Sequence, residues 1–329
     1  MNQLSDTFGR THNYLRISLT EKCNLRCTYC MPEEGIPLKP KAHFMTSDEV
    51  VGIAKEFVAL GTDKIRLTGG EPLLRKDFSE ILCQLAQLPV ELTLTTNGVL
   101  LDRFMEELVA ANVKSINISL DTLIPKRFKT ITRRSDFDRV QKNIELMQKN
   151  EIRVKINVVL MRGVNNDEII PFIRQTLTGD VDIRFIEFMP FEGNNWEWNK
   201  KISEKEILQT VFNHFGSENI QPLNIAPNST AREYKIKGAN GKFGIISTVT
   251  HPFCDTCNRI RLTADGKVKN CLFSNQETDL LSAYRNKERI TPLIIQNIMQ
   301  KEHSRGGLDM SKPELVQLHE NRSMITIGG

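Results

Sequence analysis

The chain has 329 residues, of which 40% are hydrophobic and 26% are charged, and its formal net charge is +4. This length and composition are typical of a soluble globular protein with one large α/β domain and a smaller region. The charge is too small for a dedicated nucleic-acid binder, and no apolar run is long enough to span a membrane. We therefore expect neither nucleic acid nor a membrane as a partner. The first ten residues contain no apolar signal core, which predicts a cytoplasmic protein whose cysteines stay reduced.

Strand and helix patterns alternate through the first 188 residues. The first strand is expected over residues 14–20, and a capping-box pattern at Thr46 and Glu49 predicts that a helix follows to about residue 60. The next strands are expected at Lys64–Thr68, Glu91–Thr95, Ser115–Ser119, Arg153–Val159 and Ile183–Phe188, and the helices near residues 77–87, 102–111, 136–149 and 167–177. This repeat predicts parallel strands with right-handed crossovers. Six units indicate an α/β fold with an open or partial (βα)6 barrel.

A cysteine-rich loop follows the first strand directly. Cys23, Cys27 and Cys30 form a C-x3-C-x2-C array. Three thiolates from one loop can hold three irons of a [4Fe-4S] cluster and leave the fourth iron open. Zinc is the main alternative because C-x2-C pairs often bind it, whereas disulfides would need an oxidising compartment. The spacing favours the cluster.

Polar or glycine-rich residues stand at the ends of four successive predicted strands. After the cysteine loop come Gly69-Gly70-Glu71-Pro72, Thr95-Thr96-Asn97-Gly98 and Ser119-Leu120-Asp121. Each could be ordinary turn chemistry by itself. Because the carboxyl ends of parallel strands share one rim, their repetition predicts a functional site there.

A second cysteine set, at Cys254, Cys257 and Cys271, lies in the C-terminal part of the chain. His251 could complete a zinc site, but two sets of three cysteines are explained more simply by two clusters that each have an open iron. Cys83, in contrast, lies in an apolar helical pattern and is expected to be a small core residue.

Several basic residues fall on predicted strands. Arg259 and Arg261 are two residues apart and therefore face the same side of a strand, beside the second cysteine set. A solvated basic face is one interpretation, and a site for phosphate oxygens is the other. The other strand cations that could face the same cavity are Arg16, Arg66, Lys155 and Arg184. Such cations repel one another unless an anion is present, which favours a polyanionic substrate.

The region after residue 188 has a different pattern. Residues 189–202 contain both tryptophans and are expected to form a loop over the barrel mouth. Short strands are expected at 232–237, 244–249, 259–263 and 267–269, and helices at 203–215, 275–286 and 291–302. We therefore predict a barrel domain over residues 1–200 and a smaller α+β region over 201–329 that carries the second cysteine set.

Taken together, these motifs resemble the radical S-adenosylmethionine (SAM) enzymes. The cysteine array with the aromatic Tyr29 before its last cysteine is similar to the signature of that superfamily. The Gly69–Pro72 turn, the second cysteine set and the terminal Gly328-Gly329 narrow the resemblance to the GTP 3′,8-cyclase family of molybdenum cofactor biosynthesis. The resemblance covers nearly the whole chain.

The resemblance implies two [4Fe-4S] clusters, SAM as a cofactor and GTP as the substrate. It implies a 5′-deoxyadenosyl radical that removes hydrogen from C3′ of GTP, after which C3′ joins C8 of guanine. The expected partners are a reductase or flavodoxin-type electron donor and a downstream cyclic pyranopterin monophosphate synthase, and the family is compatible with a homodimer.

The resemblance also assigns roles to individual residues. The implied SAM-binding residues are Tyr29, Gly69, Gly70, Glu71, Ser119 and Met189. The expected substrate contacts are Thr95 and the six strand arginines and lysines named above. Catalytic roles are implied for Arg259, Arg261, Gly328 and Gly329. The resemblance implies that the two glycines belong to a tail that reaches the active site. From the residues alone, the alternative for this tail is a frayed terminus.

Two other functions compete with this prediction. A peptide-modifying radical SAM enzyme would usually carry more C-terminal cysteines than the three found in this set. A zinc-stabilised nucleic-acid-binding protein would show salt-sensitive binding, and neither the small net charge nor the βα repeat favours it.

Overall fold

In the computed structural model, a single twelve-stranded sheet organises the described residues, which are 3–37, 39–194, 196–224, 226–310, 312, 316 and 321–328. The middle six strands are parallel neighbours in sequence order. They are β1 (Tyr14–Ser18), β2 (Lys64–Thr68), β3 (Glu91–Thr96), β4 (Ser115–Ser119), β5 (Arg153–Leu160) and β6 (Val181–Glu187). The predicted partial (βα)6 barrel is therefore confirmed.

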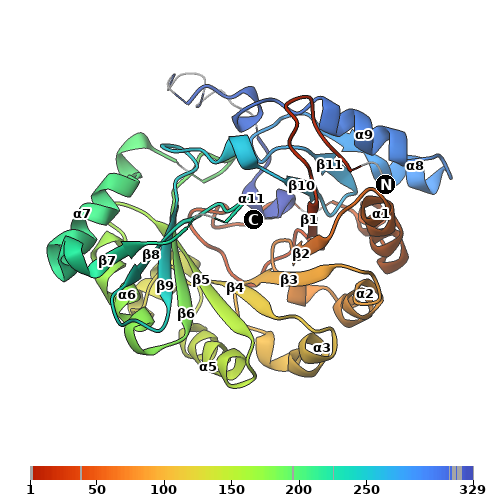
Figure 1. Cartoon of the computed structure of the whole chain (residues 1–329). Coiled ribbons are helices and arrows are strands. Elements are labelled where there is room, and N and C mark those ends of the chain that lie inside the picture. Colours follow the sequence, from red (N-terminus) through yellow and green to blue (C-terminus); the bar gives the residue numbers. More distant parts are fainter. Residues whose placement is uncertain are drawn as a thin grey trace.

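The helices of the repeat lie on the outer face of the curved sheet (Figure 1). They are α1 (Ser47–Ala59), α2 (Phe78–Leu85), α3 (Met105–Ala110), α4 (Pro125–Thr132), α5 (Phe137–Lys149) and α6 (Ile169–Thr178). The expected capping box of α1 is present, because Thr46 and Glu49 each accept a hydrogen bond from the other's backbone N–H. Helix α4 was not expected from the sequence.

The C-terminal part of the chain extends the same sheet at both edges. On one side β9 (Lys242–Ile246) pairs in parallel with β6, followed by the antiparallel strands β8 (Arg232–Ile236) and β7 (Ile220–Pro222). On the other side β10 (Arg259–Leu262) pairs in parallel with β1, followed by the antiparallel strands β11 (Lys267–Lys269) and β12 (Thr278–Asp279). The sheet thus runs unbroken across the predicted boundary at residue 200, and the division into two domains stays a prediction.

The remaining helices are α7 (Glu204–Phe215), α8 (Leu280–Arg285), α9 (Thr291–Met299) and α11 (Met324–Ile327). The predicted helix over 275–286 is wrong in its first part, where the short strand β12 stands instead. None of the helices in the described part of the chain combines the length and apolarity that crossing a bilayer requires.

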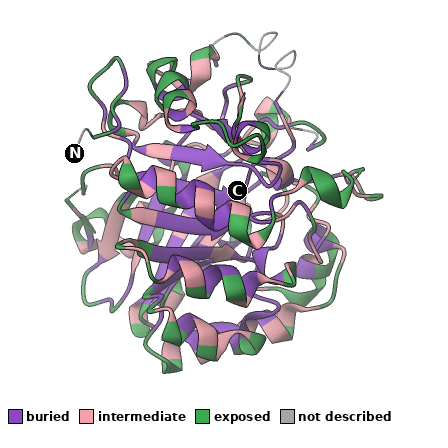
Figure 2. Ribbon diagram, turned by 90° about the vertical axis from the view of Figure 1, so that its right-hand side faces the viewer, coloured by how far each residue is buried: buried purple, intermediate pink, exposed green. Residues whose placement is uncertain are grey.

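The main core lies between the sheet and its helices, where the strands are almost entirely buried (Figure 2). Phe57, Phe78 and Phe172 fill it from α1, α2 and α6. Cys83 is not part of this core: it lies on the exposed side of α2, so the prediction of a core cysteine was wrong.

The C-terminal end lies inside the ring of strands beside α11 (Figure 1), which places the tail at the concave face of the sheet.

Candidate active site

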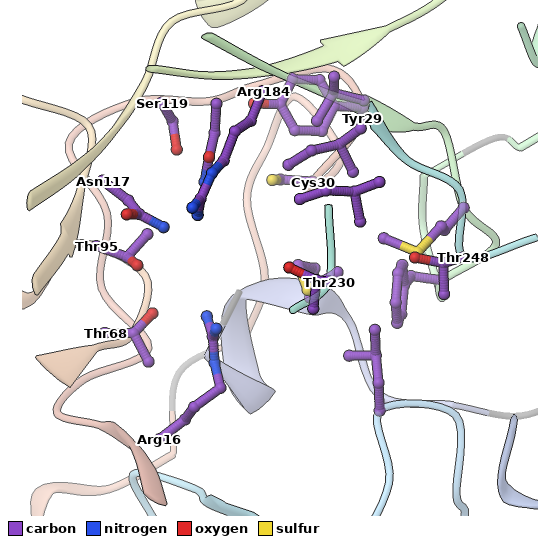
Figure 3. A pocket seen from close by; sticks show the side chains of 18 of the residues that line it. Arg16, Tyr29, Cys30, Thr68, Thr95, Asn117, Ser119, Arg184, Thr230 and Thr248 are labelled. Atoms are coloured by element: carbon purple, nitrogen blue, oxygen red, sulfur yellow. The ribbon is translucent and has the colours of Figure 1, made fainter. Parts of the chain in front are cut away.

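A cavity of about 430 Å³ occupies the concave side of the sheet. All six cysteines of the two predicted cluster sites line it, together with residues from every strand of the βα repeat. Figure 3 shows one wall of the cavity, formed by Thr68, Thr95, Asn117 and Ser119 with Arg16 and Arg184 at its ends. The structure therefore brings both cysteine sets and the predicted substrate cations to one space.

Helix α4 holds the first cysteine loop in place. The backbone N–H groups of Arg26 and Thr28 donate to the carbonyls of Thr132 and Ile131, at distances of 2.9 and 3.0 Å. The Arg26 guanidinium donates back to the Cys23 carbonyl at 2.6 Å. These bonds fix the loop backbone, so that the thiols of the array line the cavity.

The first three thiols lie in an environment that suits a metal cluster. Burial raises the pKa of Cys23 to about 11 and the pKa of Cys27 and Cys30 further still, and the neighbouring thiols add to the effect. A bound metal deprotonates such thiols outright. Three thiols from one loop, open to a cavity on one side, fit a [4Fe-4S] cluster with one free iron.

The second cysteine set is accompanied by buried positive charge. The Lys301 ammonium group is 3.6 Å from the Cys257 sulfur, and the residue is only 4% exposed. Burial alone would raise the pKa of Cys257, but Lys301 and Arg259 lower it to about 7. A buried cation needs an anionic partner, and thiolates of an anionic cluster provide one here.

The zinc interpretation gains little from His251. Its side chain is 61% exposed, and its ring nitrogen Nδ1 lies 3.9 Å from a Glu204 carboxylate oxygen. His251 is also absent from the cavity lining. Within the described ranges, no three His, Cys, Asp or Glu side chains converge as ligands of a single metal ion would.

Two rows of side chains cross the sheet and point into the cavity. Strand register places residues side by side on β2, β1 and β10, and residues two apart on a strand share a face. The rows are Arg66–Arg16–Arg261 and, two residues earlier, Lys64–Tyr14–Arg259. Lys155 and Arg184 reach the same cavity from β5 and β6.

Like charges dominate this cavity. Among the described lining residues eight are Lys or Arg and only two, Asp121 and Glu187, are acidic. Burial, followed by the charge of Arg184, lowers the pKa of Lys155 to about 8, and burial lowers the pKa of Arg261 to about 10. The two carboxylates are already used: Asp121 accepts from Tyr29 and Val159, and Glu187 accepts from Val249 and Thr250. Lys64 and Arg184 have carboxylate partners outside the lining, Glu91 and Glu233. The cavity still has an excess of positive charge, which a polyanion would neutralise.

The glycine turn after β2 forms as the motif requires. A Cβ on Gly70 would lie 2.4 Å from the Lys22 carbonyl oxygen, so only glycine fits there. Glu71 does not line the cavity; its buried carboxylate instead accepts hydrogen bonds from Leu73 N, Thr96 Oγ1 and Asn97 N. Burial still raises the pKa of Glu71 to about 7. Its position indicates that it joins the two strand-end turns.

The other predicted SAM contacts, Tyr29, Gly69, Gly70, Ser119 and Met189, all line the cavity, as does Thr95. Tyr29 donates its hydroxyl proton to Asp121 at 2.7 Å. Gly328 is buried, and its carbonyl accepts a hydrogen bond from Arg261 Nη1. Gly329 lies outside the described residues.

Sequence reasoning missed several cavity residues. Lys64 and Tyr14 precede Arg66 and Arg16 by two positions, so strand periodicity could have found them. Asn117 and Asn157 lie on β4 and β5 at the same wall. Arg305 also lines the cavity, but no sequence pattern points to it.

Comparison with known proteins shows the family of this chain. Residues 17–176 match the radical SAM superfamily, and residues 181–306 match the molybdenum cofactor synthesis C-terminal family. The GTP 3′,8-cyclase of Peptoclostridium acidaminophilum is 43% identical over 99% of this chain and 98% of its own length. The mitochondrial GTP 3′,8-cyclase of Arabidopsis thaliana is 43% identical over 100% of this chain and 84% of its own length.

Some relatives are much longer. Molybdenum cofactor biosynthesis protein 1 of Mus musculus is 45% identical over 99% of this chain but over only 51% of its own length. The chain thus spans about half the length of such relatives. Among solved structures, SuiB of Streptococcus suis bound to S-adenosylmethionine has a TM-score of 0.58 at 17% identity, covering 83% of this chain and 65% of SuiB. That likeness supports the fold.

The cofactors follow from these matches. The radical SAM superfamily, which residues 17–176 match, binds SAM and a [4Fe-4S] cluster. The chain is similar to a GTP 3′,8-cyclase over its full length and matches both family models. These matches agree with the presence of two cysteine sets around one cavity. The chain therefore belongs to the GTP 3′,8-cyclase family of radical SAM enzymes.

Proposed function

We propose that this chain converts GTP to (8S)-3′,8-cyclo-7,8-dihydroguanosine 5′-triphosphate in molybdenum cofactor biosynthesis. The observation that carries the proposal is one cavity lined by both cysteine sets and eight basic side chains. When bound, SAM and the first cluster supply the 5′-deoxyadenosyl radical that removes hydrogen from C3′. The residues of this chain orient the nucleotide, balance its charge and exclude water.

The two rows of strand side chains bind the triphosphate in this proposal. A guanidinium group can donate two parallel hydrogen bonds to phosphate oxygens. Arg16, Arg66 and Arg261 lie side by side on neighbouring strands and would bind the phosphates in this way. Arg66 and Arg261 are buried, which strengthens their contacts because little water competes for the charges. Lys155 and Arg184 add charge from the opposite strands.

The second cysteine set and the tail hold the guanine end in this proposal. Cys254, Cys257 and Cys271 would present the open iron of the second cluster to the cavity. Arg259 and Arg261 are the members of the two rows that stand on β10, two and four residues after Cys257, and the Gly328 carbonyl of the tail accepts a hydrogen bond from Arg261. Catalytic roles for Arg259, Arg261, Gly328 and Gly329 remain part of the proposal.

The proposal also includes partners and location. A reductase or flavodoxin-type protein would supply the electrons for reductive cleavage of SAM and for completion of the reduced product. A cyclic pyranopterin monophosphate synthase would consume the product, and a homodimer is included in the proposal. The seven unpaired cysteines support a reducing, cytoplasmic location, although the Arabidopsis relative is named mitochondrial.

The first experiment combines metal analysis with an activity assay on anaerobically prepared protein. About eight irons per chain are expected if each cysteine set holds a four-iron cluster. GTP, SAM and a reductant should then give the cyclised nucleotide, methionine and 5′-deoxyadenosine. Zinc without iron would overturn the proposal, whereas iron and SAM cleavage that GTP does not affect would point to a different radical SAM substrate such as a peptide.

A further inference from the structure

The last described residues, 321–328, run from the rim of the barrel into the cavity. Met324 and Ile325 line the cavity, and Ile327 is buried among apolar side chains at its edge. Gly328 is so close to β1 and β2 that a Cβ there would lie 2.8 Å from Thr68 Cγ2 and 3.2 Å from Ser18 Cβ. A segment placed this tightly in a cavity has lost much conformational freedom, so side-chain contacts must offset that cost.

Arg322 makes the strongest polar contacts of this segment. Its two terminal nitrogens pair with both oxygens of Asp265, at 3.0 and 2.9 Å. One of them also lies 2.7 Å from a Glu277 oxygen. Asp265 is almost completely buried, and the two-pronged geometry is the strong form of an arginine–carboxylate pair. The hydrogen bonds from Arg322 and Lys39 outweigh burial and hold the pKa of Asp265 well below its usual range, so the carboxylate stays charged.

The neighbours of Arg322 fasten the segment to the two cysteine loops. Asn321 donates to the carbonyl of Leu272, the residue after Cys271, at 2.9 Å. Ser323 donates to the carbonyl of Cys30 at 3.0 Å. The segment therefore touches the last cysteine of the first set and the residue next to the last cysteine of the second set.

Both ends of the segment are held by the same hairpin. Asp265 lies in the turn between β10 and β11, and Arg261, which binds the Gly328 carbonyl, lies on β10. The distance between the two anchor points on the hairpin is fixed by its backbone. Arg322 and Gly328, six residues apart, are thus both held by this one hairpin.

We infer that Arg322 is a positioning residue, whose ion pairs with Asp265 and Glu277 seat the C-terminal segment in the cavity and set the place of the Gly328 carbonyl at Arg261. The inference concerns the folded chain and does not depend on the proposed reaction. It predicts that loss of the Arg322 charge frees the segment from the cavity while the rest of the fold stays intact.

Hydrogen–deuterium exchange of the full-length, cluster-loaded protein tests the inference directly. In Arg322→Gln, the amides of the peptide containing residues 321–328 should exchange about tenfold faster or more, because local opening of the segment no longer breaks an ion pair. Arg322→Lys should restore part of the protection, since lysine keeps the charge but not the fork.

Arg139→Gln provides a matched control. Arg139 also pairs with both oxygens of one carboxylate, Asp102, at 3.2 and 3.0 Å. It lies on α5, on the outer face of the sheet, and its loss should leave tail exchange unchanged. Should Arg322→Gln fail to fold, Glu277→Gln removes one partner and should give a smaller acceleration.

Unchanged exchange in residues 321–328 of folded Arg322→Gln would overturn the inference. So would equal acceleration in the Arg139→Gln control, which would mean that any lost ion pair loosens the tail. Because exchange is read without turnover, these outcomes stay separate from success or failure of the GTP assay.

Discussion

Lys301 brings a positive charge to the second cysteine set from outside the predicted motifs. Its polar contacts in the described part of the chain are the Cys257 sulfur, the Arg259 carbonyl and His12 Nδ1, at 3.6, 3.2 and 3.4 Å. None of these is a carboxylate. The charge of a bound cluster is thus what the ammonium group would balance.

Replacing this lysine should change the redox behaviour of one cluster only. In Lys301→Met the midpoint potential of the second cluster should fall by roughly 100 mV, because a charge about 6 Å away is worth about 2–3 kcal/mol at an effective dielectric constant of 20. A redox titration followed by electron paramagnetic resonance measures both clusters, and the first serves as internal control. An unshifted second cluster would contradict the prediction.

The buried His12 makes the free energy of unfolding depend on pH. Burial, reinforced by the charge of Lys301, lowers the pKa of His12 to about 4 from the value of 6.5 expected in the unfolded chain. The folded state thus favours neutral His12, so its contribution is complete above pH 6.5 and is lost as pH falls towards 4. The loss should reach about 3 kcal/mol in urea unfolding of the metal-free protein. In His12→Gln the decrease over this range should be much smaller, and an unchanged slope would refute the assignment.

At the scale of elements, α4 supports the first cysteine loop through backbone bonds. Thr28→Pro removes the N–H that donates to Ile131, whereas Thr28→Ala keeps it. The proline variant should therefore lose the first cluster and hold about four irons per chain, while the alanine variant should keep about eight. Iron analysis and visible absorption decide between these outcomes. Full iron content in Thr28→Pro would show that α4 is not needed for the loop.

The elements also show what a sequence can predict. The strands of the βα repeat were placed within about two residues, because each is a short apolar run bounded by turn residues. Helix α4 was not predicted because it is short and gives too few apolar positions for a helical period to be seen. Its sequence is PKRFKTIT, and its buried residues are Phe128, Ile131 and Thr132. Strand β12 has two residues and therefore no periodicity to detect.

The site was predictable where it depends on local motifs. The cysteines and the Gly69-Gly70 turn need only their immediate neighbours to be recognised, and the structure brings both to the cavity. The charged rows depend on register between strands from distant parts of the chain, such as Arg16 beside Arg261. Periodicity shows which face a side chain takes, but not which strand lies next to it.

At the scale of the whole molecule, the positive charge of the cavity lining favours the binding of polyanions. Eight basic and two acidic lining residues repel a cation and attract a triphosphate. GTP should bind at least about tenfold more tightly than GMP, which corresponds to about 1.4 kcal/mol. Calorimetry on the cluster-loaded protein measures both affinities, with guanosine as the uncharged control. Equal affinity for GTP and GMP would exclude the rows as the triphosphate site.

The pairing of β1 with β10 has a consequence for how the protein is made. Strand β1 leaves the ribosome long before its partner along one edge, because Arg259–Leu262 is synthesised only after more than two hundred further residues. At 5–20 residues per second, this leaves the edge of β1 without a partner for roughly ten seconds or more. During that time an exposed strand edge can pair with another nascent chain. The strand that later carries Arg16 into the cavity therefore has an unpaired edge during most of the chain's synthesis.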